Sequence, residues 1–122
     1  MNQGPALPAI DVVEAERRLR EDPDRPLLVD VREENEFADV RAPGAVLVPM
    51  SSFAARAGEL PKDRPLMVVC HLGSRSAAAA GFLIRSGWND IVNVTGGMDA
   101  WERGGLPVRR GMPGPGEGDL PG

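Results

Sequence analysis

Short apolar runs alternate with segments of helical character along most of this chain. The apolar runs lie at residues 27–31, 45–48, 66–70 and 91–94, and a shorter one lies at residues 7–10. Continuous apolar runs of this length, bounded by turn-forming residues, are typical of parallel strands that are covered on both faces. The pattern therefore predicts about five strands buried between layers of helix.

Helical signals fill the segments between these runs. Asp11 stands in an N-cap position with Glu14 three residues later, as in a capping box, and Pro23 ends this helix. A second helix is predicted over residues 74–86, with Gly87 in the position of a C-terminal cap. Shorter helical pieces are expected at residues 33–37, 51–58 and 97–103. Strands that alternate with helices predict an α/β fold, with a central parallel sheet of about five strands and helices on both faces.

The composition is that of an ordinary globular domain. The chain has 122 residues, of which 42% are hydrophobic and 26% charged, enough for one domain with a single core. Its net charge is −4 with scattered basic residues, so the sequence has no nucleic-acid footprint. No apolar stretch approaches the roughly 18 residues of a membrane span, and the N-terminus does not resemble a signal peptide. The single cysteine excludes an internal disulfide and favours a reducing compartment, so we expect a cytoplasmic protein without nucleic-acid or membrane partners.

One domain is expected over residues 7–110, after a short N-terminal extension at residues 1–6. Residues 111–122 are rich in Pro, Gly and acidic side chains and contain few apolar ones. Such a composition cannot bury enough apolar surface to offset chain entropy, so this segment is expected to be a disordered tail.

Cys70 is the strongest candidate for chemistry. It ends the apolar run at residues 66–70 and precedes a helix that is expected to begin at Ser74. In parallel sheets, ligands bind beyond the carboxyl ends of the strands, where Cys70 is expected to lie. Backbone N–H groups and the helix N-terminus would stabilise its thiolate, the nucleophilic form. The alternative interpretation is a buried cysteine that acts as a small hydrophobic residue at a strand end.

The loop after Cys70 is predicted to bind the substrate. Its small residues would aim their amides inward, as in an anion-binding nest, and Gly73 would let the backbone curl. Arg75 and His71 would add positive potential, although Arg75 could instead bind a carboxylate and His71 could point to solvent. No metal site is expected, because one cysteine beside one histidine cannot supply the three or four ligands that zinc requires. The candidate substrate-binding residues are His71, Leu72, Gly73, Ser74, Arg75 and Ser76.

Four segments, in this order, resemble those of single-domain rhodaneses, and the resemblance covers about residues 7–110. They are Asp30-Val31-Arg32 followed by Glu36-Phe37, Pro43-Gly44-Ala45, Cys70-x-x-Gly73-x-Arg75-Ser76, and Gly96-Gly97-x-x-Ala100-Trp101. Asp30 and Arg32 are expected to support the rim of the site as a structural pair. Arg41 departs from the family pattern, since the position two residues before the Pro-Gly-Ala turn is usually His, and it is placed with this supporting group.

The resemblance implies a rhodanese-like three-layer fold and a sulfurtransferase activity without a cofactor. The Cys70 thiolate would take a sulfane sulfur from a small anionic donor such as thiosulfate and become a persulfide. Cyanide, a thiol or a protein acceptor would then remove that sulfur.

Two other classes of function stay open from the residues alone. Cysteine phosphatases and arsenate reductase-like enzymes also hold a thiolate in an amide cradle, but they have five residues between Cys and Arg. Only four residues separate Cys70 from Arg75 here, and a tighter ring suits one sulfur atom better than a tetrahedral oxyanion. Non-catalytic rhodanese-like binding modules typically lack the cysteine that this chain has.

Overall fold

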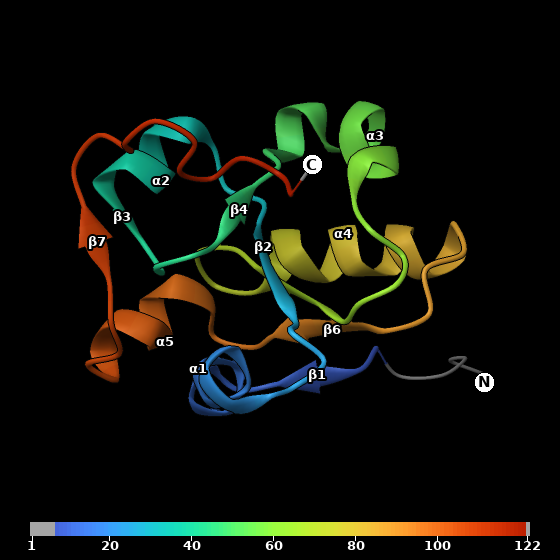
Figure 1. Cartoon of the computed structure of the whole chain (residues 1–122), viewed down its shortest axis with the longest axis horizontal. Helices are drawn as coiled ribbons and strands as arrows, with labels where there is room; N and C mark the ends of the chain where they lie inside the picture. The colour runs from blue at the N-terminus through green and yellow to red at the C-terminus, as the bar shows by residue number, and fades with distance from the viewer. Residues whose placement is uncertain (1–6, 122) are drawn as a thin grey trace.

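A parallel sheet of five strands forms the centre of the computed structural model, which describes residues 7–121. Its strand order is β1-β6-β5-β2-β4, with all neighbours parallel (Figure 1). The sequence prediction of an α/β fold with about five parallel strands is therefore confirmed. The strands are β1 (Ala9–Ile10), β2 (Leu27–Asp30), β4 (Val46–Leu47), β5 (Leu66–Val69) and β6 (Ile91–Val94).

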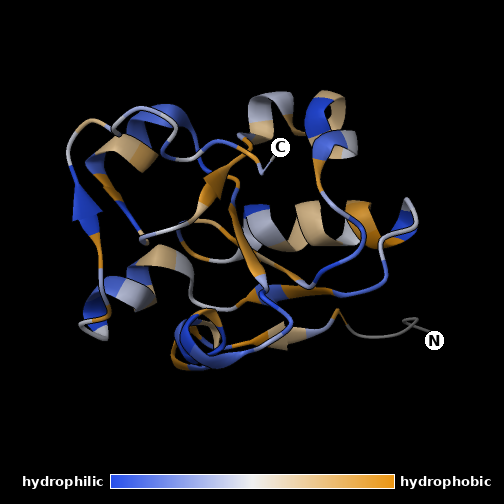
Figure 2. Cartoon of the chain, viewed as in Figure 1, coloured by the Kyte–Doolittle hydropathy of each residue, from blue (hydrophilic) through white to orange (hydrophobic). Residues whose placement is uncertain are grey.

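Helices cover both faces of this sheet. The sheet therefore divides the core into two parts. Alternate residues of β5 supply the two sides, with Met67 packed on one face and Val68 on the other. In Figure 2 the strands of this sheet are mostly apolar, whereas the helices carry both polar and apolar residues. One face carries α1 (Val12–Glu21), α2 (Glu34–Asp39) and α5 (Gly97–Arg103), and the other carries α3 (Phe53–Arg56) and α4 (Ser74–Arg85). Within residues 7–121, no helix is long and apolar enough to cross a membrane.

A local sequence signal explains where α1 begins, and the helical region at residues 50–59 is more divided than expected. The Asp11 side chain accepts a 2.8 Å hydrogen bond from the Glu14 amide, so α1 begins where its N-cap residue predicts. The Glu14 carboxylate does not complete a capping box but pairs with Arg17 and Arg18 on the exposed face of α1. The helical piece expected at residues 51–58 is divided into η1 (Met50–Ser52), α3 and η2 (Ala57–Glu59).

The C-terminal segment contacts α2 and β4. A two-residue antiparallel pair, β3 (Val40–Arg41) with β7 (Arg109–Arg110), comes before it. The segment then returns across α2 to β4, where the carbonyl oxygen of Gly118 accepts a 2.8 Å hydrogen bond from the Leu47 amide (Figure 1). The edge strand thereby gains a backbone partner. Polar contacts hold this segment, and apolar content alone gives no signal of them.

Candidate active site

Cys70 lies in the turn between β5 and α4, at the carboxyl edge of the central strand. The residue is 1% exposed, and its Sγ accepts a 3.0 Å hydrogen bond from the amide of Gly73. Gly73 is the N-cap residue of α4 and has a φ of +118°, a backbone conformation that L side chains rarely adopt. The glycine therefore turns the loop so that its amide faces the sulfur.

Further donors stabilise the thiolate form of Cys70. The hydroxyl of Ser76, which is fully buried, lies 3.3 Å from Sγ. Burial alone would raise the pKa of Cys70. Hydrogen bonds from the Ser76 hydroxyl and from the amides of Ser76, Gly73 and Leu72 outweigh it, so the pKa lies below its ordinary value. The site can thus hold a reactive thiolate in a small ring of donors.

The N-terminus of α5 holds the outer side of the loop. The Met98 amide donates a 2.8 Å hydrogen bond to the carbonyl oxygen of Cys70, and the Asp99 amide donates one of 3.0 Å to that of His71. A Cβ atom at Gly97 would collide with both carbonyl oxygens, so only glycine permits this approach. Because these carbonyls face α5, the amides that follow them can face the sulfur.

Asn93 anchors the loop to β6. Its side chain is 6% exposed, and its Nδ2 donates a 3.3 Å hydrogen bond to the carbonyl oxygen of Gly73. Sequence analysis did not place this residue in the site. The available signal was a single amide side chain within the apolar run at residues 91–94, where a buried polar group requires a hydrogen-bond partner.

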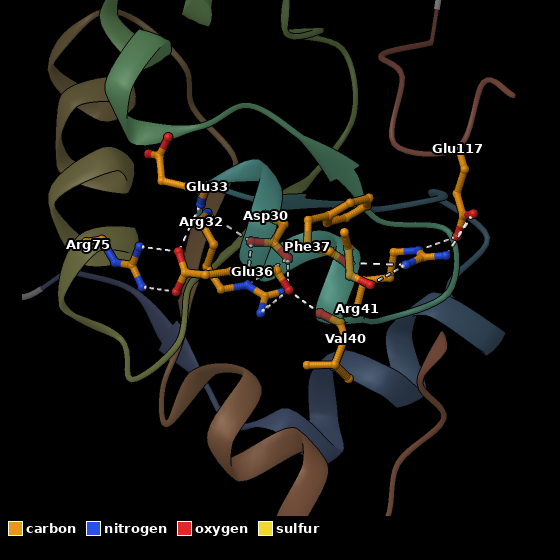
Figure 3. A network of polar contacts seen from close by, with 10 residues as sticks. Asp30, Arg32, Glu33, Glu36, Phe37, Val40, Arg41, Arg75 and Glu117 are labelled. Carbon is orange, nitrogen blue, oxygen red and sulfur yellow. Dashed lines mark hydrogen bonds and ion pairs between the residues drawn. The ribbon is translucent and has the colours of Figure 1, made fainter. Parts of the chain in front are cut away.

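Arg75 lies in the first turn of α4 and forms an ion pair with Glu36 of α2. Its two Nη atoms donate hydrogen bonds of 2.8 and 2.9 Å to the two Oε atoms of Glu36 (Figure 3). The pair with Arg75 contributes most to a pKa of about 2 for Glu36. Of the two roles considered for Arg75, carboxylate binding is the one that the structure contains. Substrate contact by Arg75 stays a prediction.

Asp30, the last residue of β2, forms a buried ion pair with Arg32. Asp30 is fully buried and Arg32 is 2% exposed, and the closest ion-pair contact, from Nη2 to Oδ2, is 2.7 Å. Arg32 also donates hydrogen bonds to the carbonyl oxygens of Val40 and Glu36. These contacts fix the polypeptide between β2 and β3, and with it α2 (Figure 3). The pair thus positions Glu36.

Arg41 lies at the opposite end of this polar network from Arg75 (Figure 3). Its guanidinium pairs with Glu117 and donates hydrogen bonds to the carbonyl oxygens of Phe37 and Gly111. The sequence prediction placed Arg41 with the residues that support the site, and that role stays a prediction. In the structure, Arg41 contacts the C-terminal segment through Glu117 and Gly111.

The remaining loop residues lie on the surface of the site. His71 and Ser74 are exposed, and Leu72 is 64% exposed at the tip of the loop. Their predicted contacts with substrate involve groups that solvent can reach. Among residues 7–121, no cluster of three or more His, Cys, Asp and Glu side chains is arranged to hold a metal ion.

Comparison with known proteins shows which family this chain belongs to. Residues 11–103 match the rhodanese-like domain family. A sulfurtransferase of Allochromatium vinosum is 40% identical over 82 residues, which cover 67% of this chain and 77% of that protein. The thiosulfate sulfurtransferase GlpE of Actinobacillus succinogenes is 34% identical over 82 residues, which cover 67% of this chain and 74% of GlpE. The resemblance seen in the four sequence segments is confirmed.

Solved structures show the same fold. A rhodanese-related protein of Thermoplasma volcanium superimposes with a TM-score of 0.76 at 30% identity, covering 84% of this chain and 97% of that chain. A rhodanese-like domain protein of Staphylococcus aureus gives a TM-score of 0.70 at 34% identity, covering 78% of this chain and 91% of that chain. The expected rhodanese-like architecture is therefore confirmed as well.

Proposed function

The chain belongs to the rhodanese-like domain family and is a rhodanese-type sulfurtransferase, and we propose that Cys70 carries the transferred sulfur as a persulfide. The observation that carries this proposal is the buried Cys70 thiol, held by the Gly73 amide at 3.0 Å and the Ser76 hydroxyl at 3.3 Å. The names of the relatives support the reaction class, since two of them are a sulfurtransferase and a thiosulfate sulfurtransferase.

In the first step, the Cys70 thiolate attacks the outer sulfur of a donor such as thiosulfate. A bond forms between Sγ and that sulfur while the bond between the two donor sulfurs breaks, and sulfite leaves with the electron pair. The negative charge then lies on the terminal sulfur of the persulfide. Burial raises the pKa of the Cys70 thiol, and the hydrogen-bond donors around it lower that pKa. The same donors can also stabilise the anionic persulfide.

In the second step, an acceptor removes the terminal sulfur. Cyanide or a thiolate attacks it, the sulfur–sulfur bond breaks, and the Cys70 thiolate is regenerated. Cys70 is the single cysteine of these 122 residues, so a thiol acceptor comes from another molecule. A cysteine that is 1% exposed would keep the persulfide sheltered until that acceptor arrives.

The spacing of the loop supports sulfur transfer over phosphate chemistry. Four residues separate Cys70 from Arg75, and the Arg75 guanidinium is already paired with Glu36. A phosphatase of this type would need its arginine to bind the oxyanion. Phosphate esters are therefore expected to be poor substrates, and a cysteine held by the Gly73 amide and the Ser76 hydroxyl argues against a purely non-catalytic binding module.

Intact mass spectrometry tests the proposal directly. Incubation with thiosulfate should add the mass of one sulfur atom to the wild-type protein, and cyanide should remove it with formation of thiocyanate. Cys70→Ser should gain no sulfur while keeping the wild-type circular dichroism spectrum. Transfer that persists in this variant, or hydrolysis of p-nitrophenyl phosphate at a rate comparable with sulfur transfer, would refute the proposal.

A further inference from the structure

The cation beside the reactive loop is neutralised by a carboxylate from another helix. We propose that Glu36 is a specificity-determining residue which, by holding Arg75 in an ion pair, disfavours dianionic sulfur donors and favours organic persulfides. This inference rests on the proposed function, because it concerns the donor that loads Cys70.

Three separate contacts hold Glu36 in place. Its carboxylate binds both Nη atoms of Arg75, at 2.8 and 2.9 Å. Its Oε1 also accepts a 2.9 Å hydrogen bond from the Glu33 amide at the start of α2. Its carbonyl oxygen accepts a hydrogen bond from Arg32, which is itself fixed by Asp30. Glu36 is thus a preorganised partner that does not need to move to meet Arg75.

The pair persists over the pH range in which the thiol reacts. Chiefly because of Arg75, the pKa of Glu36 is about 2, so its carboxylate is ionised at neutral pH. The pKa of Arg75 is raised, first by Glu36 and to a smaller extent by the charge of Cys70. Arg75 lies in the first turn of α4, directly after the reactive loop, and its positive charge is offset by Glu36.

An anionic donor consequently gains little from this cation. To bind Arg75 with both Nη atoms, it would have to break two charge-assisted hydrogen bonds that are already formed. His71 is the other basic side chain of residues 70–76, and Arg32 nearby is committed to Asp30. Thiosulfate carries two negative charges close to the sulfur that it donates, so it meets an approximately neutral pair rather than a free cation.

An organic persulfide fits this environment better. In its protonated form RSSH, the terminal sulfur carries no net charge and needs no cation to approach the thiolate. Cys70 Sγ forms a bond to that terminal sulfur, the bond between the two donor sulfurs breaks, and RS⁻ leaves with the electron pair. The proton of the donor stays on the transferred sulfur, so atoms and charge balance without another reactant.

The test compares two donors in three proteins. The donors are thiosulfate and 2-hydroxyethyl persulfide, which has no charged group besides its persulfide, and the proteins are the wild type, Glu36→Gln and the control Glu34→Gln. Gln keeps the shape of Glu36 and can still accept a hydrogen bond from Arg75, but it frees the positive charge of that side chain. Glu34 is an exposed residue of the same helix, and its substitution removes one negative charge without touching the pair.

For Glu36→Gln we expect kcat/KM with thiosulfate to rise about fivefold, the order of effect of one unit charge on a dianion several ångströms away in water. With 2-hydroxyethyl persulfide, which carries at most one negative charge, kcat/KM should stay within about twofold of the wild type, because half the donor charge halves the interaction free energy. Glu34→Gln should change neither. A fall with both donors would show that Glu36 only supports the fold of the site, and an equal rise with both would show a general effect on the thiolate. Either result overturns the inference.

Added salt provides a second readout that needs no variant. Screening weakens attraction between a free cation and an anion. In the wild type, kcat/KM with thiosulfate should therefore not fall as NaCl is added, whereas in Glu36→Gln it should fall. A steep fall in the wild type would mean that Arg75 already attracts the donor, and it would overturn the inference even if the variant did not fold. If the wild type takes sulfur from neither donor, it is the proposed function that fails.

Discussion

The backbone amide of Met98 donates a 2.8 Å hydrogen bond to the carbonyl oxygen of Cys70. This contact means that the direction of the reactive loop is set partly by α5, which follows a different strand. The amides of Met98 and Asp99 each donate a hydrogen bond to one loop carbonyl oxygen. The loop amides can therefore face the sulfur. The orientation of the thiolate cradle is therefore a tertiary property rather than a property of the loop sequence alone.

Gly97→Ala should inactivate the enzyme without removing Cys70. The new Cβ would collide with the carbonyl oxygens of Cys70 and His71, and Gly97 also has a φ of +58°, which strains an L side chain. Displacement of the loop by about 1 Å can lower the rate roughly a hundredfold. The measurement is the rate of sulfur transfer together with the rate of Cys70 alkylation.

Gly58→Ala is the matched control for this substitution. Gly58 lies in η2, and a Cβ atom there would meet nothing within 4 Å. We expect its sulfur transfer to equal that of the wild type. Wild-type activity in Gly97→Ala would show that the loop tolerates displacement and that its contact with α5 does not orient the thiolate.

Ser76→Ala should raise the pKa of Cys70. In the wild type, burial raises this pKa, but the hydrogen bond from the Ser76 hydroxyl and those from loop amides outweigh it. Removal of the hydroxyl leaves the burial and weakens the stabilisation of the thiolate, so the midpoint of alkylation rate against pH moves upward. Ser86→Ala, at the far end of α4, serves as the control. An unchanged midpoint in Ser76→Ala would mean that the backbone amides alone lower the pKa of Cys70.

The sequence predicted the parts of the structure that depend on short-range patterns. The apolar runs located the five strands of the sheet, and the position of Cys70 at the end of one run placed it at the carboxyl edge. Asp11 located the start of α1 because an N-cap residue acts through local hydrogen bonds. Each of these signals involves residues close together in the chain.

The parts that the sequence did not predict depend on contacts between distant residues. Arg75 and Glu36 are 39 positions apart, and Arg41 and Glu117 are 76 positions apart. A charged side chain in a sequence does not indicate which partner it will meet. The strands β3 and β7 consist of Val40–Arg41 and Arg109–Arg110, so no apolar run marks either of them. The contacts of the C-terminal segment also join residues that are far apart in the chain, so its composition could not predict them.

Asp30→Asn should destabilise the fold strongly. Asp30 is fully buried and is the carboxylate that pairs with Arg32, so its neutralisation leaves a buried guanidinium without a counter-charge. Breaking a buried pair from one side costs about 3–5 kcal/mol, a large part of the about 5–15 kcal/mol that stabilises a typical domain. Urea unfolding monitored by circular dichroism gives the value. The double variant Asp30→Asn with Arg32→Met should lose less, and an equal or larger loss would show that the penalty is not the unpaired charge.

Glu117→Gln should lower stability in a pH-dependent way. The Arg41 guanidinium and the Gly114 amide hold the pKa of Glu117 at about 2, below its usual 4.5. A carboxyl group whose pKa is lowered in the folded state stabilises the fold above its usual pKa, and this contribution is lost as pH falls from about 4.5 to about 2. The unfolding temperature of Glu117→Gln should therefore lie below that of the wild type at pH 7, and the difference should shrink towards pH 2. Glu59→Gln removes a carboxylate from an exposed pair with Arg56 and should have little effect at either pH, because such pairs contribute little. A difference between the wild type and Glu117→Gln that stays constant with pH would show that the ion pair with Arg41 does not hold the C-terminal segment.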